Sequence, residues 1–270
     1  MQVVGYDTGA GGDEPAALLI ANGGAVDREP LVPGRELCYT LGERRCAGTV
    51  TAGAGNGDEA GNGDEASDDD VHRACEHSEA PYCPEHTHRW PCARCTGDCD
   101  LPLESCREEH AVYLAAFAPD RFKVGVTRSW RLRTRLREQG ADRAAHVRTV
   151  VDGQVARQVE ADIATRMPDR VRIPEKVSGL HRAVDEDAWH ELLSEFDVIE
   201  AFDFEYGLDL DAQPVSETLA TGTVLGTQGR LLVLARETGT YAIDLRDLVG
   251  HEIETGASSR DLQSSLGSFG

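Results

Sequence analysis

The cysteines of this chain are concentrated in one stretch, and that clustering limits the possible folds more than any other feature of the sequence. All eight lie between Cys38 and Cys106, and the densest part contains Cys92, Cys95 and Cys99. Two thiolates separated by two residues can turn around one metal ion, because the tight turn between them points both sulfurs inward. A segment this rich in cysteine, proline and charge has too few apolar residues for a core of its own, so we expect bound metal to hold it together.

A tetrahedral zinc site needs four ligands, so eight cysteines provide enough for two structural sites. We predict one site from Cys92, Cys95, Cys99 and Cys106, and a second from Cys38, Cys46, Cys75 and Cys83. Further candidate ligands are His110, His77, His86 and His88. The spacing leaves the assignment of each cysteine to an ion open. It disfavours a redox pair, which needs only two cysteines, and buried structural thiols, which do not normally cluster in this way.

The N-terminal segment Met1 to Asp13 lacks the basic region and apolar stretch of a signal peptide. No apolar run approaches the roughly 18 residues needed to span a bilayer. We therefore expect a soluble cytoplasmic protein with no membrane partner. A reducing compartment favours metal binding over disulfides for the eight cysteines.

The charge of the chain is strongly acidic, with 48 Asp and Glu against 27 Lys and Arg and a net charge of −21. Lysine is almost absent, since Lys123 and Lys176 are the only two. This combination resembles proteins of salt-loving archaea, in which carboxylates keep the surface hydrated and salt screens their repulsion. The alternative is an acidic protein with an arginine preference. Because the net charge would then report the habitat, it does not exclude a nucleic-acid partner.

Patterning along the chain predicts an α+β protein in several parts. We predict N-terminal strands in 1–48, a disordered acidic and glycine-rich insert in 49–70, a cysteine-rich zinc module in 71–110, an α/β domain in 111–200, a C-terminal antiparallel β segment in 201–255 and a flexible tail in 256–270. The insert repeats GNGDEA and cannot bury enough apolar surface to offset its ordering entropy. Glycine-bearing turns separate C-terminal strands at 221–226, 230–235 and 241–245, a meander that the N-terminal strands could complete.

The central part alternates strand and helix signals. Ala111–Phe117 and Phe122–Thr127 predict a hairpin, and His146–Val151 a third strand. Arg131–Gln139 reads as a short helix closed by Gly140. Val155, Val159, Ile163 and Met167 lie four apart and predict an amphipathic helix over 154–167. A further helix begins at Asp185, whose carboxylate is a suitable N-cap.

Positive charge is concentrated between Arg121 and Arg148, where nine basic residues face only Glu138 and Asp142. In so acidic a chain this concentration favours an anionic partner, and phosphates are the usual one. The predicted nucleic-acid contacts are Arg128, Arg131, Arg133 and Arg137. Pairing of these arginines with carboxylates elsewhere in the chain is the alternative.

The central segment resembles the GIY-YIG nuclease domains, through Val112-Tyr113 on one strand and Lys123-Val124-Gly125 on the next. That resemblance implies a three-stranded antiparallel sheet with helices. It also implies an active site in which Tyr113 matches the first tyrosine, Lys123 replaces the second, Arg135 matches the helix arginine and Glu160 the metal-binding glutamate. Lysine in place of the second tyrosine puts the activity, rather than the fold, in question.

The chain is also similar to an uncharacterised conserved family, the domain of unknown function numbered 2797. The residues that carry this resemblance are Cys106-x3-His110, Val112 to Ala115, Lys123 to Arg128, Arg135, Glu138 to Ala141 and Gly250-His251-Glu252. It covers most of the chain except residues 49–70 and the tail. It implies a fold and leaves the function open.

Three functions follow from these observations. The first is a zinc-stabilised nuclease in which Glu160 holds Mg²⁺ or Mn²⁺, Arg135 neutralises developing charge, and Tyr113 with Lys123 positions or deprotonates the nucleophile. The second is a nucleic-acid-binding protein, of RNA or DNA, without cleavage. The third is a protein-interaction adaptor that docks through its zinc module. Each residue also has a plainer interpretation: Tyr113 as core, Arg135 paired with Glu138, and Glu160 as a helix residue beside Arg157.

Overall fold

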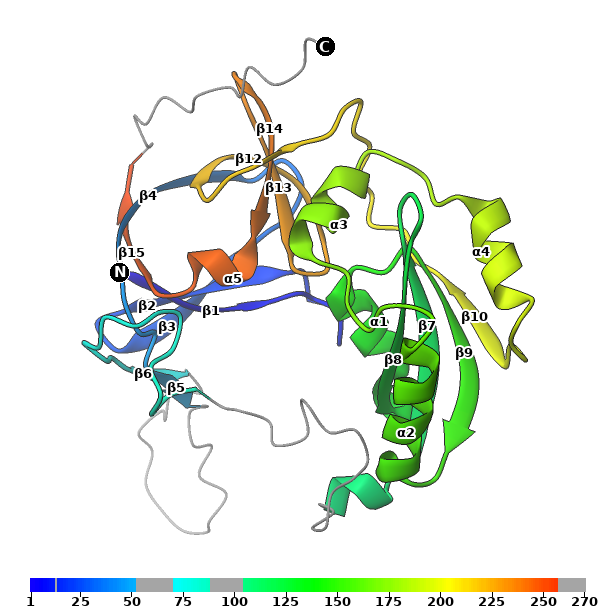
Figure 1. The fold of residues 1–270 in the computed structure, drawn as a ribbon. Helices are drawn as coiled ribbons and strands as arrows, with labels where there is room; N and C mark the ends of the chain where they lie inside the picture. The colour runs from blue at the N-terminus through cyan, green and yellow to red at the C-terminus, as the bar shows by residue number, and fades with distance from the viewer. Residues whose placement is uncertain (13, 52–69, 88–103, 257–270) are drawn as a thin grey trace, which may run out of the picture.

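Two β-sheets lie side by side in the computed structural model, which describes residues 1–12, 14–51, 70–87 and 104–256 (Figure 1). Both ends of the chain build a large sheet, and the middle of the chain builds a smaller sheet covered by helices. The described part of the chain is therefore mixed α and β, with mostly strands and few helices.

The large sheet has eleven strands in the described residues, in the order β11-β14-β13-β12-β4-β15-β1-β2-β3-β6-β5. Their bounds are β1 (Gln2–Asp7), β2 (Ala17–Asn22), β3 (Ala25–Pro30), β4 (Glu36–Arg44), β5 (Thr49–Thr51), β6 (Val71–Arg73), β11 (Val215–Ser216), β12 (Ala220–Gln228), β13 (Leu231–Arg236), β14 (Gly239–Asp244) and β15 (His251–Thr255). The N-terminal strand β4 pairs with β12, Cys38 opposite Thr221, so the N-terminal strands do complete the C-terminal meander.

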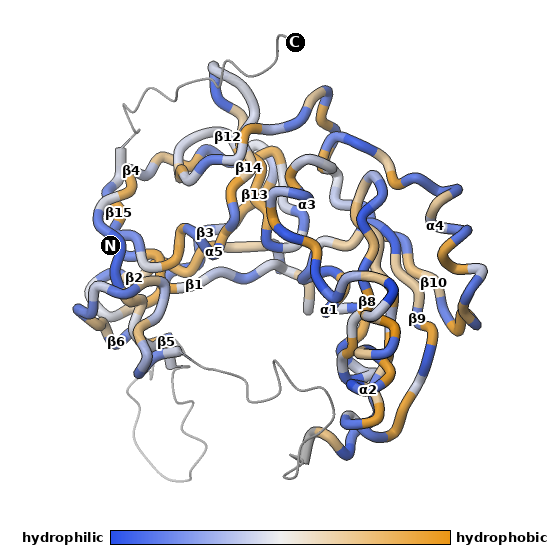
Figure 2. The backbone as a smooth tube through the Cα atoms, viewed as in Figure 1, coloured by the Kyte–Doolittle hydropathy of each residue, from blue (hydrophilic) through white to orange (hydrophobic). Residues whose placement is uncertain are grey.

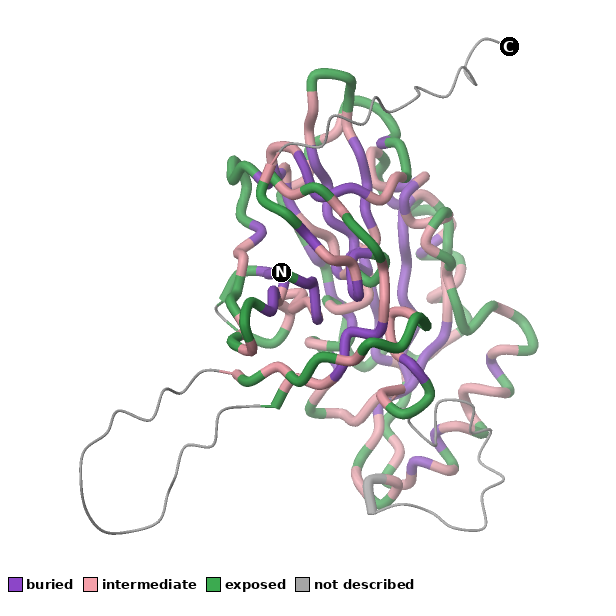
Figure 3. Tube along the Cα trace, turned by 90° about the vertical axis from the view of Figure 1, so that its left-hand side faces the viewer, coloured by how far each residue is buried: buried purple, intermediate pink, exposed green. Residues whose placement is uncertain are grey.

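The core of the large sheet lies on the concave side of its curve, around the short helix α5 (Leu245–Leu248) (Figure 1). Leu245 and Leu248 are fully buried there, against the apolar faces of β2, β13 and β14. The apolar segments follow these strands in Figure 2, and Figure 3 shows buried segments running through the interior of the molecule. Burial of each such leucine stabilises the fold by about 1.5–3 kcal/mol.

The smaller sheet has the order β10-β9-β7-β8 and is antiparallel throughout. Its strands are β7 (His110–Phe117), β8 (Arg121–Arg128), β9 (Arg143–Val150) and β10 (Glu200–Asp203). The predicted hairpin and third strand are confirmed. The expected total of three strands is wrong, because β10 pairs with β9 along its whole length and extends the sheet.

Helices cover both faces of this sheet, and its central strand β7 is buried from Ala111 to Phe117. The even-numbered residues of β7 pack with α2 (Gly153–Ala164) and α4 (Glu186–Leu193), whereas its odd-numbered residues pack with α1 (Leu132–Gln139). This alternation is the two-residue period of a strand. It explains why β7 reads as a continuous apolar run in the sequence.

The ends of these helices follow local signals. Gly140 ends α1 in the left-handed conformation, with φ of 70°. The carboxylates of Asp152 and Asp185 accept hydrogen bonds from the first turns of α2 and α4. The apolar stripe of α2 differs from the prediction, since Ala156 is buried whereas Val155 is 43% exposed.

Helix α3 (Ile173–Gly179) joins the two sheets and was not predicted. Val177 packs against Leu231 of the large sheet. Gly179 lies so close to the β7–β8 turn that an added Cβ would be 1.7 Å from the Ala118 carbonyl oxygen. Beside α3, the Gln228 amide of β12 donates to the Gly140 carbonyl at 2.9 Å, so the large sheet contacts the end of α1 directly.

Two predicted segments, the insert 49–70 and the C-terminal tail, extend outside the described residues. The strand β5 occupies 49–51, the first residues of the expected insert, because it pairs with β6 across that segment. The GNGDEA repeat and the Ser/Gly-rich tail from 257 onward lie outside the described residues. No helix in the described ranges is long and apolar enough to cross a bilayer.

Candidate metal centre and candidate active site

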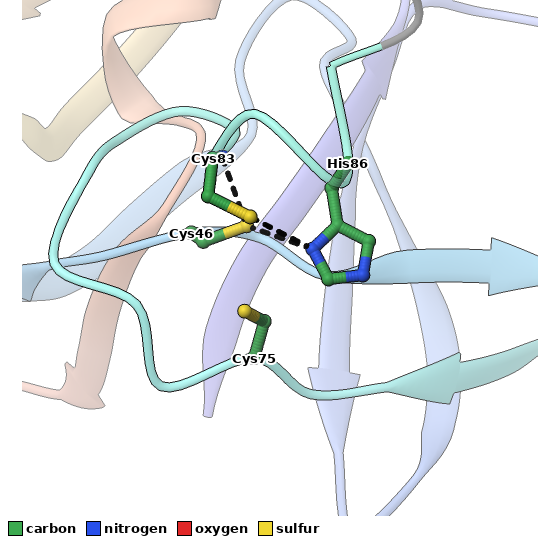
Figure 4. A group of neighbouring side chains, drawn as sticks. All are labelled: Cys46, Cys75, Cys83 and His86. Carbon is green, nitrogen blue, oxygen red and sulfur yellow. Dashed lines mark hydrogen bonds between the residues drawn. The ribbon is translucent and has the colours of Figure 1, made fainter.

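Three thiols and one imidazole converge beside the large sheet (Figure 4). Cys46 follows β4, Cys75 follows β6, and Cys83 and His86 belong to the loop 74–87. The four potential ligand atoms all lie within 4.8 Å of one another. His86 Nδ1 is 3.4 Å from the sulfur of Cys46 and 3.2 Å from that of Cys83.

Backbone hydrogen bonds hold this cluster in place. The Cys46 amide donates to the His77 carbonyl at 2.9 Å, which ties the loop 74–87 to the end of β4. The amides of Gly48 and Cys83 donate to the Cys46 sulfur at 3.4 and 3.3 Å. A tight turn, closed by the His86 amide on the Cys83 carbonyl, brings both of those side chains to the same place. These two amide donors fix the position of the Cys46 sulfur relative to the loop 74–87.

The geometry fits a tetrahedral metal ion. With bonds of about 2.0–2.3 Å, the ligand atoms of a tetrahedral zinc site are about 3.3–3.8 Å apart, close to the sulfur–nitrogen distances here. Three cysteines and one histidine form a common structural zinc set. Cys46 and Cys83 are buried, whereas Cys75 and His86 are half-buried. Four protein ligands would leave no open position on a tetrahedral ion for a substrate. The cluster could hold a metal ion such as zinc.

The ligand set differs in one member from the second cysteine group predicted from the sequence. Cys38 is exposed on β4 and lies outside the cluster, where His86 supplies the fourth ligand atom. His86 was only one of several candidate histidines, although the spacing Cys83-x2-His86 is itself a metal-binding signal. Of the first predicted group, Cys92, Cys95 and Cys99 lie outside the described residues.

A separate pocket of about 550 Å³ lies at the β8 side of the small sheet. It is lined by all four side chains that the nuclease resemblance singled out, Tyr113, Lys123, Arg135 and Glu160. They come from four different elements, β7, β8, α1 and α2. Cys106 and His110 border the same pocket and both approach Gly153, so this cysteine lies at the pocket rather than in the metal cluster.

Tyr113 is buried at the base of this pocket. Its ring lies over Gly125, its cross-strand neighbour, where an added Cβ would be 2.5 Å from the phenol carbon and oxygen. The Gln139 amide donates to the Tyr113 hydroxyl at 2.6 Å. Burial raises the pKa of Tyr113 above its ordinary value, more than the nearby Gln139 and Arg135 lower it. The hydroxyl therefore stays protonated at neutral pH.

Lys123 lies half-buried beside Tyr113, with its ammonium 5.9 Å from the ring centre. It donates a hydrogen bond to the Asp169 carbonyl at 3.0 Å. Burial, assisted by the charge of Arg135, lowers the pKa of Lys123 to about 8. A part of this amine is therefore neutral near pH 7 and can accept a proton.

Two of the plainer interpretations are present as ion pairs. Arg157 pairs with Glu160 at 2.6 Å, and Arg135 pairs with Glu138 at 3.1 Å. Glu160 and Arg135 nevertheless border the pocket, and the Arg135 side chain is 47% exposed. A guanidinium has five N–H donors, so a single ion pair leaves others for a ligand.

The arginines predicted to bind nucleic acid fall into two groups. Arg128 and Arg131 border the pocket, whereas Arg133 and Arg137 are exposed outside its lining. Between the first two, the Trp130 side chain is 70% exposed, and its ring lies within 5.9 Å of both guanidinium groups. An exposed aromatic flanked by cations is a surface on which a base can stack.

Comparison with known families gives one match. Residues 71–253, more than half of the chain, match the family described as a protein of unknown function, DUF2797. The chain belongs to the DUF2797 family. No curated protein and no solved structure matches it.

The range shared with the DUF2797 family contains most of both sites. Cys75, Cys83 and His86 of the metal cluster lie in it, whereas Cys46 precedes it. The four side chains singled out in the pocket all lie within it. The family range also extends to β15, so it includes strands from both sheets.

Proposed function

We propose that this protein is a divalent-metal-dependent nuclease that cleaves phosphodiester bonds, with a GIY-YIG-like central domain and a structural zinc site. The observation that supports the proposal is the convergence of Tyr113, Lys123, Arg135 and Glu160 on one pocket from four separate elements. Their order along the chain matches the order of the corresponding residues in that nuclease family. The lysine depletion and acid excess further favour a salt-rich cytoplasm as the place of action.

The chemistry can be assigned to the side chains by their environment. Water attacks the phosphorus and the bond to the leaving oxygen breaks, while Lys123 accepts the proton of the attacking water. Tyr113, neutral at this pH, donates a hydrogen bond that orients the water or the phosphate. Arg135 and the neighbouring arginines face the negative charge that develops on the phosphate oxygens.

A hard divalent cation fits the donors of this pocket. The carboxylates of Glu160 and Asp169 both border it, and Mg²⁺ prefers carboxylate and water oxygens. Such a cation would supply charge neutralisation at a phosphate oxygen. Glu160 has one oxygen engaged by Arg157, which leaves the second for a cation.

Nucleic-acid binding without cleavage is the second candidate. The exposed Trp130 between two arginines favours it, because stacking on an aromatic ring needs no catalytic group. Stacking also persists at high salt, where the counterion release that drives phosphate binding is weak.

The test is cleavage of labelled single- and double-stranded DNA and RNA with Mg²⁺ or Mn²⁺, in low salt and in molar KCl. We expect Glu160→Gln to abolish cleavage and leave binding intact. Arg135→Ala should lower the cleavage rate by about 10²–10³-fold and weaken binding as well.

The matched control is Glu195→Gln, which removes a carboxylate that pairs with Arg166 at 2.9 Å outside the pocket. It should cleave like the wild type. Binding of every substrate without cleavage would support the second candidate. Absence of both binding and cleavage would leave the adaptor function, in which the metal-binding loop docks a protein.

A further inference from the structure

A second and larger cavity, of about 750 Å³, lies between the two sheets. One wall comes from the large sheet and includes Tyr6, Arg28 and Arg230, and the other wall comes from the small sheet and α3. Lys123 and Lys176, the two lysines of the whole chain, both border it. Because the chain has only these two lysines, their location at one cavity indicates that ammonium groups have a role there.

Positive charge in this cavity exceeds negative charge. Its basic lining residues are Arg28, Lys123, Arg135, Arg170, Arg172, Lys176 and Arg230. Its acidic lining residues are Asp7 and Glu138, and each already has an arginine partner, Arg28 at 3.2 Å and Arg135 at 3.1 Å respectively. Lys123 and Lys176 donate to backbone carbonyls, those of Asp169 and Gln139 respectively, and within the described ranges neither ammonium forms an ion pair with a carboxylate.

Lys176 shows most directly that this charge is unbalanced. Its ammonium donates to the Gln139 carbonyl at 2.7 Å and lies 4.2 Å from the centre of the Phe117 ring. Two of its three protons are left for other acceptors. Burial, together with the charges of Lys123 and Arg230, lowers the pKa of Lys176 to about 7. An anion in the cavity would reverse this repulsion and restore the charged amine.

The rest of the lining is apolar and suits a ligand larger than an inorganic ion. Leu19, Val171, Ile173 and Leu231 border the cavity beside the ring of Tyr6. A volume of this order is typical of small-molecule sites. A nucleotide combines a phosphate for the cations with a flat base for such an apolar wall.

We propose that this inter-sheet cavity binds a nucleotide phosphate. The cavity shares Lys123, Arg135 and Arg170 with the candidate active site, so the two form a continuous basic path. The nucleotide can therefore be a free one or one that belongs to a strand entering the active site. The strand form rests on the proposed function, whereas the binding of a free nucleotide does not.

The test uses full-length protein carrying Glu160→Gln, so that no cleavage interferes. Binding of a fluorescently labelled, 5′-phosphorylated single-stranded tetranucleotide and of a nucleoside monophosphate is measured by anisotropy and competition. Lys176→Met and Arg172→Gln are added one at a time. Arg172 borders the inter-sheet cavity but not the candidate active site. Its side chain is exposed, so Arg172→Gln should leave folding intact. Each should weaken binding at least about tenfold.

The control is Arg166→Gln, which removes one positive charge at a surface outside both cavities. It should bind like its parent. Equal binding by all variants would overturn the inference, as would failure of both probes to bind. Weakened binding of both probes assigns the cavity to a free nucleotide, and weakened binding of the tetranucleotide alone assigns it to a strand. Because cleavage is not the readout, failure of the nuclease proposal would leave this result unchanged.

Discussion

Lys176 carries a charge in a setting that opposes it. The groups that face it are Lys123 from β8, Arg230 from the β12–β13 turn, Arg135 from α1 and Asp244 from β14. Three of these four are cations, and only Asp244 favours the protonated amine. Asp244 is itself paired with Arg230 at 2.7 Å. The folded protein therefore binds the proton of Lys176 less tightly than the unfolded chain does.

The stability of the protein should depend on pH through this residue. The pKa of Lys176 is lowered from 10.5 to about 7 in the folded state. Between these two values the unfolded chain holds a proton that the folded chain lacks, so the free energy of unfolding rises with pH. We expect Lys176→Met to stabilise the protein most below pH 7, with a gain that shrinks toward pH 10.

The measurement is urea unfolding of both proteins across this pH range. Lys123 also titrates in this pH range, with a pKa of about 8, and its charge acts on Lys176. The difference between the two proteins therefore includes the repulsion between the two ammonium groups, which Lys176→Met removes and which also fades as pH rises. A Lys176→Met gain that is constant with pH would contradict the lowered pKa.

Elements with strong local signals were predictable from the sequence, and elements made by tertiary contacts were not. The hairpin β7–β8 was predictable from two apolar runs around a turn. Gly140 marked the end of α1, and Asp185 marked the start of α4. Strand β10 has only four residues, and it forms by antiparallel pairing with β9 rather than from a local pattern. Helix α3 is short and contains Pro174, so it has no strong helix signal of its own. Its apolar residues pack between the two sheets, an environment that exists only in the folded protein.

The sites divide in the same way. A family resemblance, rather than spacing, brought Tyr113 and Glu160 together, and the fold places both at one pocket. Spacing grouped Cys46, Cys75 and Cys83 but included Cys38, because a linear count does not show where along β4 a side chain lies. The inter-sheet cavity needed the packing of α3 between the sheets, which the sequence did not predict.

The loop 74–87 should depend on bound metal for its order. Cys83 is the only residue of this loop that is buried. Backbone entropy of about 1–2 kcal/mol per residue opposes its fixed conformation. We expect chelation of the metal, or Cys83→Ser, to increase amide hydrogen exchange in the loop and in β5–β6, with little change in β12–β14.

Cys38→Ser is the matched control, because Cys38 is an exposed thiol outside the cluster. Elemental analysis of the variants should show that Cys83→Ser lowers the amount of bound metal and that Cys38→Ser does not. Equal metal content in both variants, or unchanged exchange in the loop after chelation, would contradict a structural site at this cluster.

At the scale of the whole molecule, an acidic chain carries two cavities lined mainly by basic side chains. The chain has a net charge of −21, while basic side chains border both the candidate active site and the inter-sheet cavity. The field of the acidic surface repels a polyanion at long range, and the basic cavities attract it at short range. Salt shortens the range of the first effect, with a Debye length of about 10 Å at 0.1 M and about 3 Å at 1 M. Moderate salt should therefore favour the approach of a phosphate-bearing ligand before it weakens the final contacts.

The same surface charge predicts how folding responds to salt. Repulsion among carboxylates destabilises the compact state, and salt screens it. We expect the free energy of unfolding to rise steeply up to about 1 M KCl, where the Debye length falls to about 3 Å, and to level off beyond it. Urea unfolding in KCl and in NaCl at equal ionic strength measures the effect, and screening requires the two salts to act alike. Stability that stays flat with salt would show that the negative charge of −21 is already balanced locally. A rise that differs between the two salts would point to specific cation binding by the carboxylates instead.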